Sequence, residues 1–395
     1  MNRASAFASL AFASIGHAYA HLFEPIFYVV ALVLPAVFGL PYEEALALIV
    51  AGKLIYGLAA PFVGWLGDRW STVGMMALYF LGLGVAAMVT GLARTPMEMA
   101  LALALLGFFG SIYHPVGIAW LVRNAENPGK AIGINGVFGG LGPAVGSALG
   151  AALIAGAGWR WAFLAPGAVV AATGLLFLWL VWRGVVVETK TDRKPQPPAS
   201  RGDTLRVGLV LSLTMLCAGL IYQSTQPALP KLFSDRLDGA SVGAAGMAVT
   251  VVYVIAGLGQ VVAGHLADRF PPRLVYVGAY ALQVPLLYVA ATASGLPLVL
   301  VAVMMVSLNM AGIPAENVLL ARYTPARWRG TAFGLKFVLA FGVSGLGVPL
   351  VAYIRGSTGD FYWLFALLAA MASVVAAAGL LLPGEKPAPV PAPAE

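Results

Sequence analysis

The sequence Gly64-Trp65-Leu66-Gly67-Asp68-Arg69 recurs 200 residues later as Gly264-His265-Leu266-Ala267-Asp268-Arg269. Both copies have the pattern G-x-L-x-D-R, and both separate two long apolar segments. The return of one short polar turn in the same setting indicates an internal duplication. The chain therefore consists of two related halves.

The apolar segments on either side of these turns dominate the composition. Hydrophobic residues make up 60% of the 395 residues and charged residues 10%, and the mean hydropathy is +0.88. A soluble domain needs far more charge on its surface. Apolar runs of about 20 residues recur, which is the length an α-helix needs to cross the hydrocarbon core of a bilayer. The ten-residue alternation of membrane β-strands does not occur. We therefore predict an all-α integral membrane protein.

Twelve spans are predicted in two bundles of six. The first bundle occupies residues 1–183 and the second 207–383, with a charged, proline-rich linker at 184–206 and a disordered tail at 384–395. The tripeptide Ala18-Tyr19-Ala20 resembles a signal-peptide cleavage site, but we expect the first span to continue uncut. The predicted spans are 5–38, 42–65, 72–92, 96–122, 130–156, 161–182, 207–232, 242–265, 273–293, 296–321, 331–354 and 360–382.

The two bundles match at further positions. Glu24-Pro25 corresponds to Gln226-Pro227, and Pro115 followed by Arg123 corresponds to Pro314 followed by Arg322. Ala131-x-Gly133 likewise corresponds to Ala332-x-Gly334. These matches extend the duplication over most of the chain.

The net charge of +7 does not indicate a nucleic-acid partner, because the basic residues are confined to alternate loops. Sixteen of the 23 lysines and arginines lie on the side that holds both chain ends. The opposite side has five, and Lys53 and Lys336 lie within predicted spans. The positive-inside rule therefore predicts two cytoplasmic termini in a multi-pass protein of the inner membrane.

Twelve spans, a long central loop and a duplicated G-x-L-x-D-R turn together resemble the major facilitator superfamily over nearly the whole chain. That resemblance implies a secondary transporter that works by alternating access. The sequence has no Gly-rich phosphate loop, nucleophile elbow or cofactor motif, so we expect no cofactor and no enzyme. In the family this turn helps to hold the halves together on the cytoplasmic side. The matching latch residues are Gly64, Asp68, Arg69, Gly264, Asp268 and Arg269. The basic run that usually follows is replaced by Trp70-Ser71-Thr72-Val73.

A narrower set of motifs resembles the fosmidomycin-resistance branch, whose members export drugs using protons. The motifs are Gly16-His17, Tyr113-His114-Pro115 and Gly142-Pro143-x-x-Gly146. The branch usually has an aspartate where this chain has His21 and a glutamate where it has Val116. Both departures remove an acid. The glycines from Gly133 to Gly150 are expected to serve helix packing.

The ionisable residues inside the predicted spans are the candidates for chemistry, because a buried charge is costly. Only Glu24 and Glu316 are carboxylates deep in a span, and His17, His21, Glu24 and Tyr28 form one helical stripe. The family arrangement places spans 1, 4, 7 and 10 around a cavity. Proton coupling is assigned to Glu24, His17, His21 and Glu316. Substrate binding is assigned to His114, Tyr28, Tyr222, Gln223, Gln226, Asn309, Asn317, Lys53 and Lys336.

Each assignment has an alternative. Glu24 could form a permanent hydrogen bond with His21, and Glu316 a fixed pair with Lys336 or Lys53. The lysines could instead form an anion site or extend towards lipid headgroups. The glutamines beside Pro227 could satisfy backbone groups freed by the kink. His265, next to a turn, is expected to be solvated and without a chemical role.

Three functions remain open. The first is proton-coupled export of a small organic compound, with protons, the substrate and the lipid bilayer as partners of a monomer. The second is uptake or exchange of a small organic anion through Lys53 and Lys336. The third is transport of a transition-metal ion by His17, His21, Glu24 and His114. We expect no resident metal, because an i, i+4 histidine pair is a weak signal.

Overall fold

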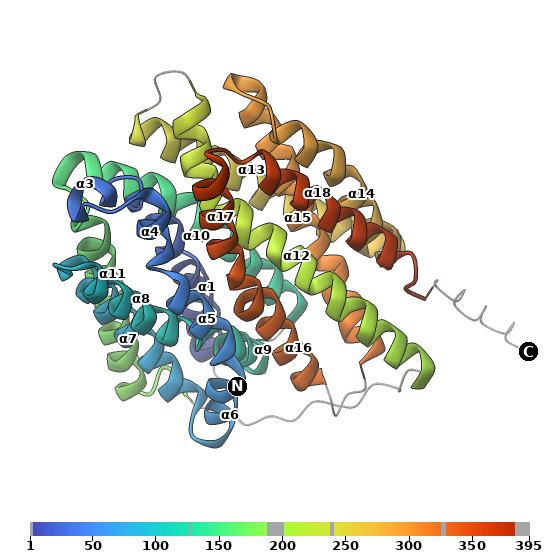
Figure 1. Cartoon of the computed structure of the whole chain (residues 1–395). Coiled ribbons are helices and arrows are strands. Elements are labelled where there is room, and N and C mark those ends of the chain that lie inside the picture. The colour runs from blue at the N-terminus through green and yellow to red at the C-terminus, as the bar shows by residue number, and fades with distance from the viewer. Residues whose placement is uncertain (1–2, 126–127, 188–200, 238–240, 325–328, 384–395) are drawn as a thin grey trace, which may run out of the picture.

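The computed structural model describes residues 3–125, 128–187, 201–237, 241–324 and 329–383. All regular elements in these ranges are helices (Figure 1). Eleven are long and apolar enough to cross a membrane, and a bent pair raises the number to as many as twelve. The predicted all-α membrane fold is confirmed. The predicted tail, 384–395, lies outside these ranges.

The first half contains six crossings, several of which are broken into shorter helices. Its elements are α1 (Arg3–Ala20), α2 (Phe23–Val30), α3 (Leu34–Phe38), α4 (Tyr42–Ala47), α5 (Val50–Leu58), α6 (Ala60–Arg69), α7 (Thr72–Leu92), α8 (Pro96–Gly110), the π-helical turn η1 (Tyr113–Gly117), α9 (Ile118–Asn124), α10 (Pro128–Ala157) and α11 (Trp161–Trp182).

The second half repeats this order with longer continuous helices. Its elements are α12 (Arg201–Arg236), α13 (Val242–Arg269), α14 (Pro272–Ala290), α15 (Gly295–Tyr323), α16 (Arg329–Phe337), the π-helical η3 (Val338–Gly342), the 3₁₀-helical η4 (Val343–Leu346), α17 (Gly347–Thr358) and α18 (Tyr362–Gly379). Because α12 begins at Arg201, residues 201–206 are helical and do not belong to the linker as predicted. Residues 188–200 of that linker are outside the described ranges.

The prediction of one continuous helix over 5–38 is wrong. A proline ring clashes with the carbonyl group four residues earlier and cannot donate a helical hydrogen bond. Pro25 and Pro35 accordingly follow breaks at His21-Leu22 and 31–33. These breaks separate α1, α2 and α3.

Three other predicted spans are also interrupted, among them 96–122, which divides into α8, η1 and α9. The span predicted at 42–65 bends by 43° before α6, where Pro61 lies in the first turn. In the span predicted at 331–354, the helix changes to η3 at Val338 and to η4 at Val343. The Ser344 hydroxyl there donates to the carbonyl oxygens of Leu339 (2.6 Å) and Leu216 (3.2 Å). Such a side-chain bond competes with the regular helical ladder.

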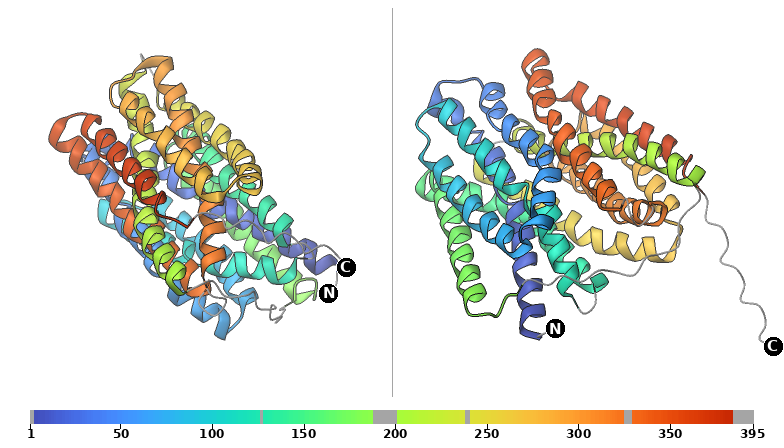
Figure 2. Two further views of the ribbon diagram at one scale, coloured as in Figure 1. Left: turned by 90° about the vertical axis from the view of Figure 1, so that its right-hand side faces the viewer. Right: turned by 90° about the horizontal axis from the view of Figure 1, so that it is seen from below.

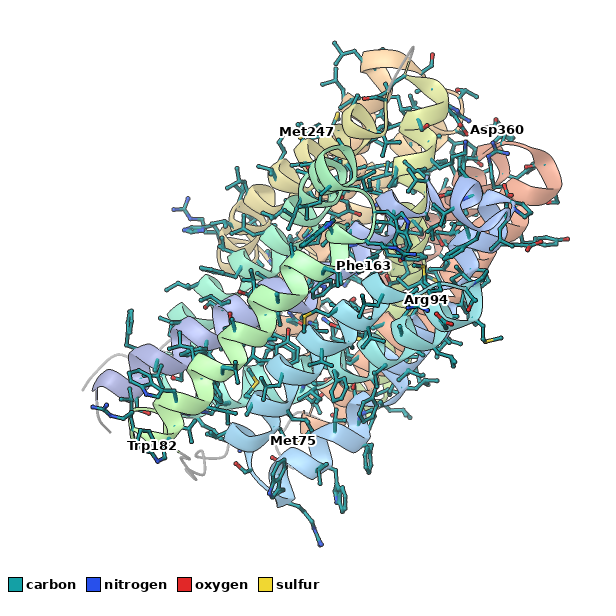
Figure 3. All side chains as sticks on the ribbon, turned by 90° about the vertical axis from the view of Figure 1, so that its left-hand side faces the viewer. Met75, Arg94, Phe163, Trp182, Met247 and Asp360 are labelled. Carbon is teal, nitrogen blue, oxygen red and sulfur yellow. The ribbon has the colours of Figure 1, made fainter. Side chains whose placement is uncertain are left out.

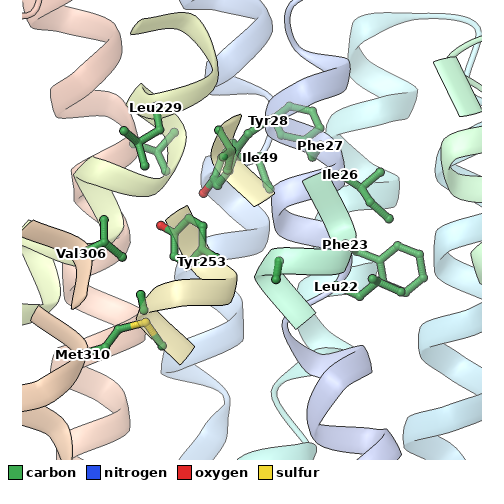
Figure 4. Packing of buried hydrophobic residues seen from close by; sticks show 14 of the residues in the cluster. Leu22, Phe23, Ile26, Phe27, Tyr28, Ile49, Leu229, Tyr253, Val306 and Met310 are labelled. Atoms are coloured by element: carbon green, nitrogen blue, oxygen red, sulfur yellow. The ribbon is translucent and has the colours of Figure 1, made fainter. Parts of the chain in front are cut away.

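The two halves lie side by side with their helices running between two ends of the molecule (Figures 1 and 2). One end carries α6, α9 and the start of α16, while α3 lies at the opposite end. Figure 3 shows Met75 and Trp182 near the first end and Met247 and Asp360 near the second. Buried apolar residues of both halves meet between them, including Tyr28 of α2, Leu229 of α12 and Tyr253 of α13 (Figure 4).

Small residues allow the halves to come into close contact. A Cβ atom on Gly57 of α5 would overlap the backbone of Gly342 at the end of η3, so the two backbones touch. α4 packs against α17 nearer the α3 end, where the Tyr42 hydroxyl donates to the Pro227 carbonyl oxygen at 3.5 Å. Close approach through glycine is typical of membrane helices, because association there depends on packing.

The seam between α10 and α13 is closed at only one end. The Thr250 hydroxyl donates to the Ala144 carbonyl oxygen at 2.8 Å, and a Cβ on Gly140 would lie 3.3 Å from the Gly257 Cα. Gly136 precedes Gly140 by four residues and Gly264 follows Gly257 by seven, so they continue the same helical faces. Neither has any atom within 4 Å of an added Cβ. The two helices therefore diverge towards the end that carries α6 and α9.

The glycines of α10 mostly serve packing, as predicted. A Cβ on Gly142 would lie 2.5 Å from the Ala18 carbonyl oxygen, and one on Gly146 would lie 2.5 Å from that of Leu22. Gly150 lies against Ile26 in the same way. These contacts hold α10 against α1 and α2, whereas Gly133 has no such neighbour.

We expect Gly57→Ala to destabilise the closed contact between α5 and η3. The added methyl group overlaps the Gly342 backbone, and overpacking of this kind costs about 1–3 kcal/mol. Thermal unfolding of the purified protein should therefore begin at a lower temperature. The matched control is Gly278→Ala in α14, where nothing lies within 4 Å. Equal melting temperatures for the two variants would contradict the close contact.

Candidate functional site

A buried ion pair lies where the first two crossings meet. Lys53 of α5 donates a hydrogen bond to Oε1 of Glu24 in α2, and the side chains are only 5% and 16% exposed. The Tyr28 hydroxyl donates to the same oxygen at 2.8 Å. Pro25 ends α1 and places Glu24 in the first turn of α2, where the free backbone N–H groups favour a negative charge.

Lys53 also extends this network into the other half. Its Nζ atom donates to Oε1 of Gln223 in α12 at 2.9 Å. Gln223 Nε2 is buried and has no partner among the described residues. The ammonium group thus connects a carboxylate of one half to an amide of the other, at a point where the halves are packed together.

A second buried ion pair lies entirely within the second half. Lys336 Nζ of α16 is 2.7 Å from Oε1 of Glu316 in α15, and both side chains are under 10% exposed. Lys336 also donates to Oδ1 of Asn317, while the Tyr276 hydroxyl donates to Glu316 Oε2 at 3.2 Å. Glu316 is therefore paired with Lys336 in this conformation, one of the two lysines that the sequence offered as its partner.

At the position equivalent to each lysine, the other half of the internal repeat has a neutral residue. The offset of the G-x-L-x-D-R turns matches Lys53 to Tyr253, and the Ala-x-Gly match aligns Lys336 with Asn135. Asn135 Nδ2 donates to the Tyr113 hydroxyl at 2.7 Å. Among the described residues each half therefore contains one such buried charged pair, and the position that matches its lysine in the other half carries a neutral hydrogen-bonding group.

Three histidines form a cluster in the first half. The ring centres of His17, His21 and His114 are 5.1–5.4 Å apart. Rings of Phe337 and Phe341 from the second half cover His114, at 5.0 and 5.1 Å. The residues predicted to form one stripe in span 1 are therefore in two groups. Because the helix breaks after α1, Glu24 pairs with Lys53 and not with His21.

A small cavity in the second half presents neutral polar groups. The Tyr253 hydroxyl and Gln283 Oε1 are buried without a partner among the described residues, although such groups usually have one. Apolar side chains complete the wall. The cavity is lined by Tyr222, Thr225, Tyr253, Gln283, Met305, Val306 and Asn309. Gln226 lies nearby, with its Nε2 3.5 Å from the Tyr222 hydroxyl.

The residues predicted to bind substrate lie in different surroundings. Tyr28, Gln223 and Asn317 were expected to bind substrate, but each is hydrogen-bonded to an ion pair. Both lysines of the anion hypothesis are neutralised by carboxylates. Tyr222 and Asn309 line the cavity, in keeping with a binding role. His265 is exposed, as predicted.

The first turn motif forms an ion pair within one half. Asp68 of α6 accepts a hydrogen bond from Arg123 of α9 at 2.8 Å, and the two side chains are 67% and 31% exposed. Gly64 packs against Pro115, with an added Cβ 3.0 Å from the Pro115 ring. Arg69 lies over the Trp65 ring at 5.5 Å. The side chain of Asp268 in the second motif is outside the described part of the structure.

Sequence reasoning missed several partners of these groups. Tyr56 lies beside His114, Tyr276 beside Glu316, and Tyr253 in the cavity wall. Of these residues, Asn135 was the easiest to recognise from the sequence, because an amide in a glycine-rich apolar span is unusual. The tyrosines gave little signal, since an aromatic residue suits both a packed core and a site.

Two bundles of membrane helices with ionisable groups at their junction define a secondary transporter. The sequence profile of the Major Facilitator Superfamily matches residues 5–238 and 211–395. The chain belongs to this family, and it is a multi-pass membrane transporter.

Relatives with named functions are similar over different lengths. The puromycin resistance protein pur8 of Streptomyces alboniger is 33% identical over 135 residues, covering 33% of this chain and 27% of that protein. The multidrug resistance protein MdtG of Rahnella sp. is 27% identical over 240 residues, covering 59% and 58%. A gallate transporter of Pseudomonas putida is 24% identical over 355 residues, covering 78% and 79%. The first of these matches thus spans about a quarter of its relative.

The fold is similar to that of a bacterial homolog of the human lysosomal transporter Spinster. Its inward-facing, unoccupied crystal structure has a TM-score of 0.70 and 15% sequence identity. The match covers 97% of this chain and 95% of that chain. At this identity the comparison concerns the fold alone.

We expect Lys53→Met to destabilise the protein more than the double variant Glu24→Gln with Lys53→Met. The single change leaves a buried carboxylate without its cation, which costs about 3–5 kcal/mol. The double change removes both charges. Denaturant or thermal unfolding of the four proteins in this cycle measures the coupling. A double variant as unstable as the sum of its single changes would mean that the pair does not interact.

Proposed function

We propose that this transporter exports a small, partly apolar organic compound in exchange for protons, with Glu24 as the main coupling group. The observation that carries the proposal is the buried Glu24–Lys53 pair, whose ammonium group also binds Gln223 of the other half. The motifs Gly16-His17 and Tyr113-His114-Pro115 support it, through their resemblance to the fosmidomycin-resistance branch.

Protonation of Glu24 would act on the contact between the halves. A neutral glutamic acid no longer compensates the charge of Lys53, and an uncompensated buried charge is strongly unfavourable. Lys53 would then be most stable where water or another anion can reach it, which favours separation of α5 from α12. Coupling requires that protonation change the relative stability of two conformations, and this network provides that difference.

The second ion pair is a weaker candidate for coupling. Glu316, Lys336, Asn317 and Tyr276 all belong to the second half. Protonating Glu316 would alter the packing of α15, α16 and α14 against each other, and would act on the other half only through α16, whose Phe337 lies against His114. We therefore assign Glu316 a supporting role.

The chemistry of the cavity suggests the class of substrate. Its free polar groups, among them Tyr253 and Gln283, are neutral, and Met305 and Val306 provide apolar surface. Its empty volume of about 200 Å³ is below that of clefts that hold drug-sized ligands, so it would have to widen to bind an organic molecule with a few hydrogen-bonding groups. The relatives from Streptomyces and Rahnella are named for drug resistance, which agrees with a drug-like substrate.

We further propose that the end carrying α6 and α9 faces the cytoplasm across an inner membrane. Sixteen of the 23 basic residues were assigned to this side by the sequence. Because α10 and α13 diverge towards it, the conformation described here would be open to the cytoplasm along that seam. An exporter would load its substrate in this state.

A second candidate is transport of an aromatic carboxylate, which the gallate transporter of Pseudomonas putida favours by its name and by the length of its match. Such a substrate needs a cation. Lys53 would be available to bind it only after Glu24 takes up a proton. In this candidate Glu24 is again the coupling group, but its protonation promotes substrate binding. In exchange of a drug for protons, protonation and substrate binding oppose each other.

We expect Glu24→Gln to abolish proton-driven transport while substrate binding stays measurable. Glutamine keeps the size of the side chain but cannot ionise. Purified protein in vesicles, with an imposed pH gradient and a fluorescent drug, measures the coupling. The control is Glu44→Gln, because Glu44 is an exposed carboxylate in α4. Normal coupling in the Glu24 variant would remove this residue from the mechanism.

We expect Tyr253→Phe to weaken substrate binding with little effect on stability. The hydroxyl has no partner in the described structure, so its loss breaks no internal hydrogen bond. One hydrogen bond to a substrate is worth about 0.5–1.5 kcal/mol, or roughly a 2- to 10-fold change in affinity. Calorimetry with puromycin and with gallate identifies the preferred class. Tyr288→Phe, on the exposed face of α14, is the control. Unchanged binding of both probes would exclude the cavity.

A further inference from the structure

The three clustered histidines resemble an incomplete set of metal ligands. His17 lies in α1, His21 in the break after α1, and His114 in η1. One nitrogen from each ring can be chosen so that all three lie within 4.8 Å of one another. No carboxylate belongs to the cluster, because Glu24 is bound by Lys53 and Tyr28. The cluster is therefore a site distinct from the proposed coupling pair.

Hydrogen bonds orient two of the rings. His17 Nδ1 lies 2.8 Å from the Asn135 carbonyl oxygen, so this nitrogen donates and Nε2 keeps a free lone pair. His114 Nδ1 lies 3.0 Å from the Tyr56 hydroxyl, which leaves its Nε2 available. Histidines that bind metals commonly use their second nitrogen in this way, because the bond fixes both the ring and the tautomer.

His21 lacks a partner altogether. Among the described residues, neither of its ring nitrogens has a hydrogen bond, and its neighbours are the rings of His17, His114 and Phe341. His21 is only partly buried, so its ring nitrogens remain open to a ligand. A ligand that all three imidazoles share would satisfy it.

From these contacts we propose that His17, His21 and His114 bind one divalent transition-metal ion, with Zn²⁺ as the reference ion. Imidazole nitrogens select Zn²⁺, Cu²⁺ or Ni²⁺ over Mg²⁺ and Ca²⁺, which prefer oxygen. Three histidines leave a fourth tetrahedral position for water or for a donor atom of a solute. All three ligands belong to the first half, so binding does not require the halves to be joined.

Access to the ion depends on the second half. Phe337 and Phe341 cover the cluster, with ring centres 5.0–6.0 Å from those of His114 and His21. Phe337 belongs to α16, which contacts α6, and Phe341 belongs to η3, which packs against α5. His114 is buried beside these rings, whereas His17 and His21 are only partly buried, so opening of this contact is expected to speed exchange of the ion.

The experiment uses full-length protein purified in detergent, with any histidine tag removed and metals stripped by a chelator. Isothermal titration with ZnCl₂ should give one ion per chain. Each of the variants His17→Ala, His21→Ala and His114→Ala should weaken binding by at least about tenfold. His265→Ala is the matched control, because His265 is the fourth histidine of the chain and is exposed in α13. Its affinity should equal that of the unaltered protein.

A second set of measurements separates ligand loss from misfolding. Co²⁺ bound by three imidazoles and water gives intense visible absorption typical of tetrahedral coordination, and the spectrum should be lost in the three histidine variants. Tyr56→Phe should fold normally and reduce Zn²⁺ affinity by about 10-fold, because it removes only the orienting hydrogen bond. Melting temperatures of all variants check their folding.

Two outcomes would overturn the site. One is the absence of Zn²⁺ and Co²⁺ binding in folded, unaltered protein. The other is binding that persists in the double variant His17→Ala with His114→Ala. The result is separable from proton coupling, because Glu24→Gln should keep full Zn²⁺ affinity whether or not it transports.

Discussion

A charged group inside a membrane protein must have a partner, and this requirement organises the centre of the molecule. Lys53 is 4% exposed and lies between Glu24 of its own half and Gln223 of the other. Removing any one of these contacts leaves a polar group buried without compensation. The packing of the halves and the charge of one carboxylate are therefore linked, and a transporter needs such a link.

Glycine and proline make this arrangement sterically possible. Gly57 and Gly342 allow α5 and η3 to touch backbone to backbone, which brings Lys53 close to α12. Pro25 interrupts the first crossing and directs Glu24 towards Lys53, while the histidines of α1 and the following break lie beside η1. The interruption thus separates two groups of ionisable residues that a straight helix would have put on one face.

The two halves have the same fold but different ionisable and polar groups in their interiors. The first half contains the histidine cluster and the Glu24–Lys53 pair, which also contacts the second half. The second half contains the Glu316–Lys336 pair, which has no such contact among the described residues, and the neutral cavity. Tyr253 and Asn135 occupy the positions that match the two lysines. Duplication supplied two similar bundles, and substitution at a few buried positions gave them different roles.

The sequence by itself determined the membrane class, the twofold organisation and the set of buried ionisable residues, because hydrophobic length and the cost of burying charge act locally along the chain. Tertiary structure alone decided the partners of these residues. Lys53 is 29 residues from Glu24 and 170 from Gln223, so their meeting depends on how separate helices pack. It also decided which prolines break a helix: α2 begins at the Pro25 break, whereas α15 continues through Pro314. Neighbouring helices determine whether a freed carbonyl group is satisfied, and a single sequence does not contain that information.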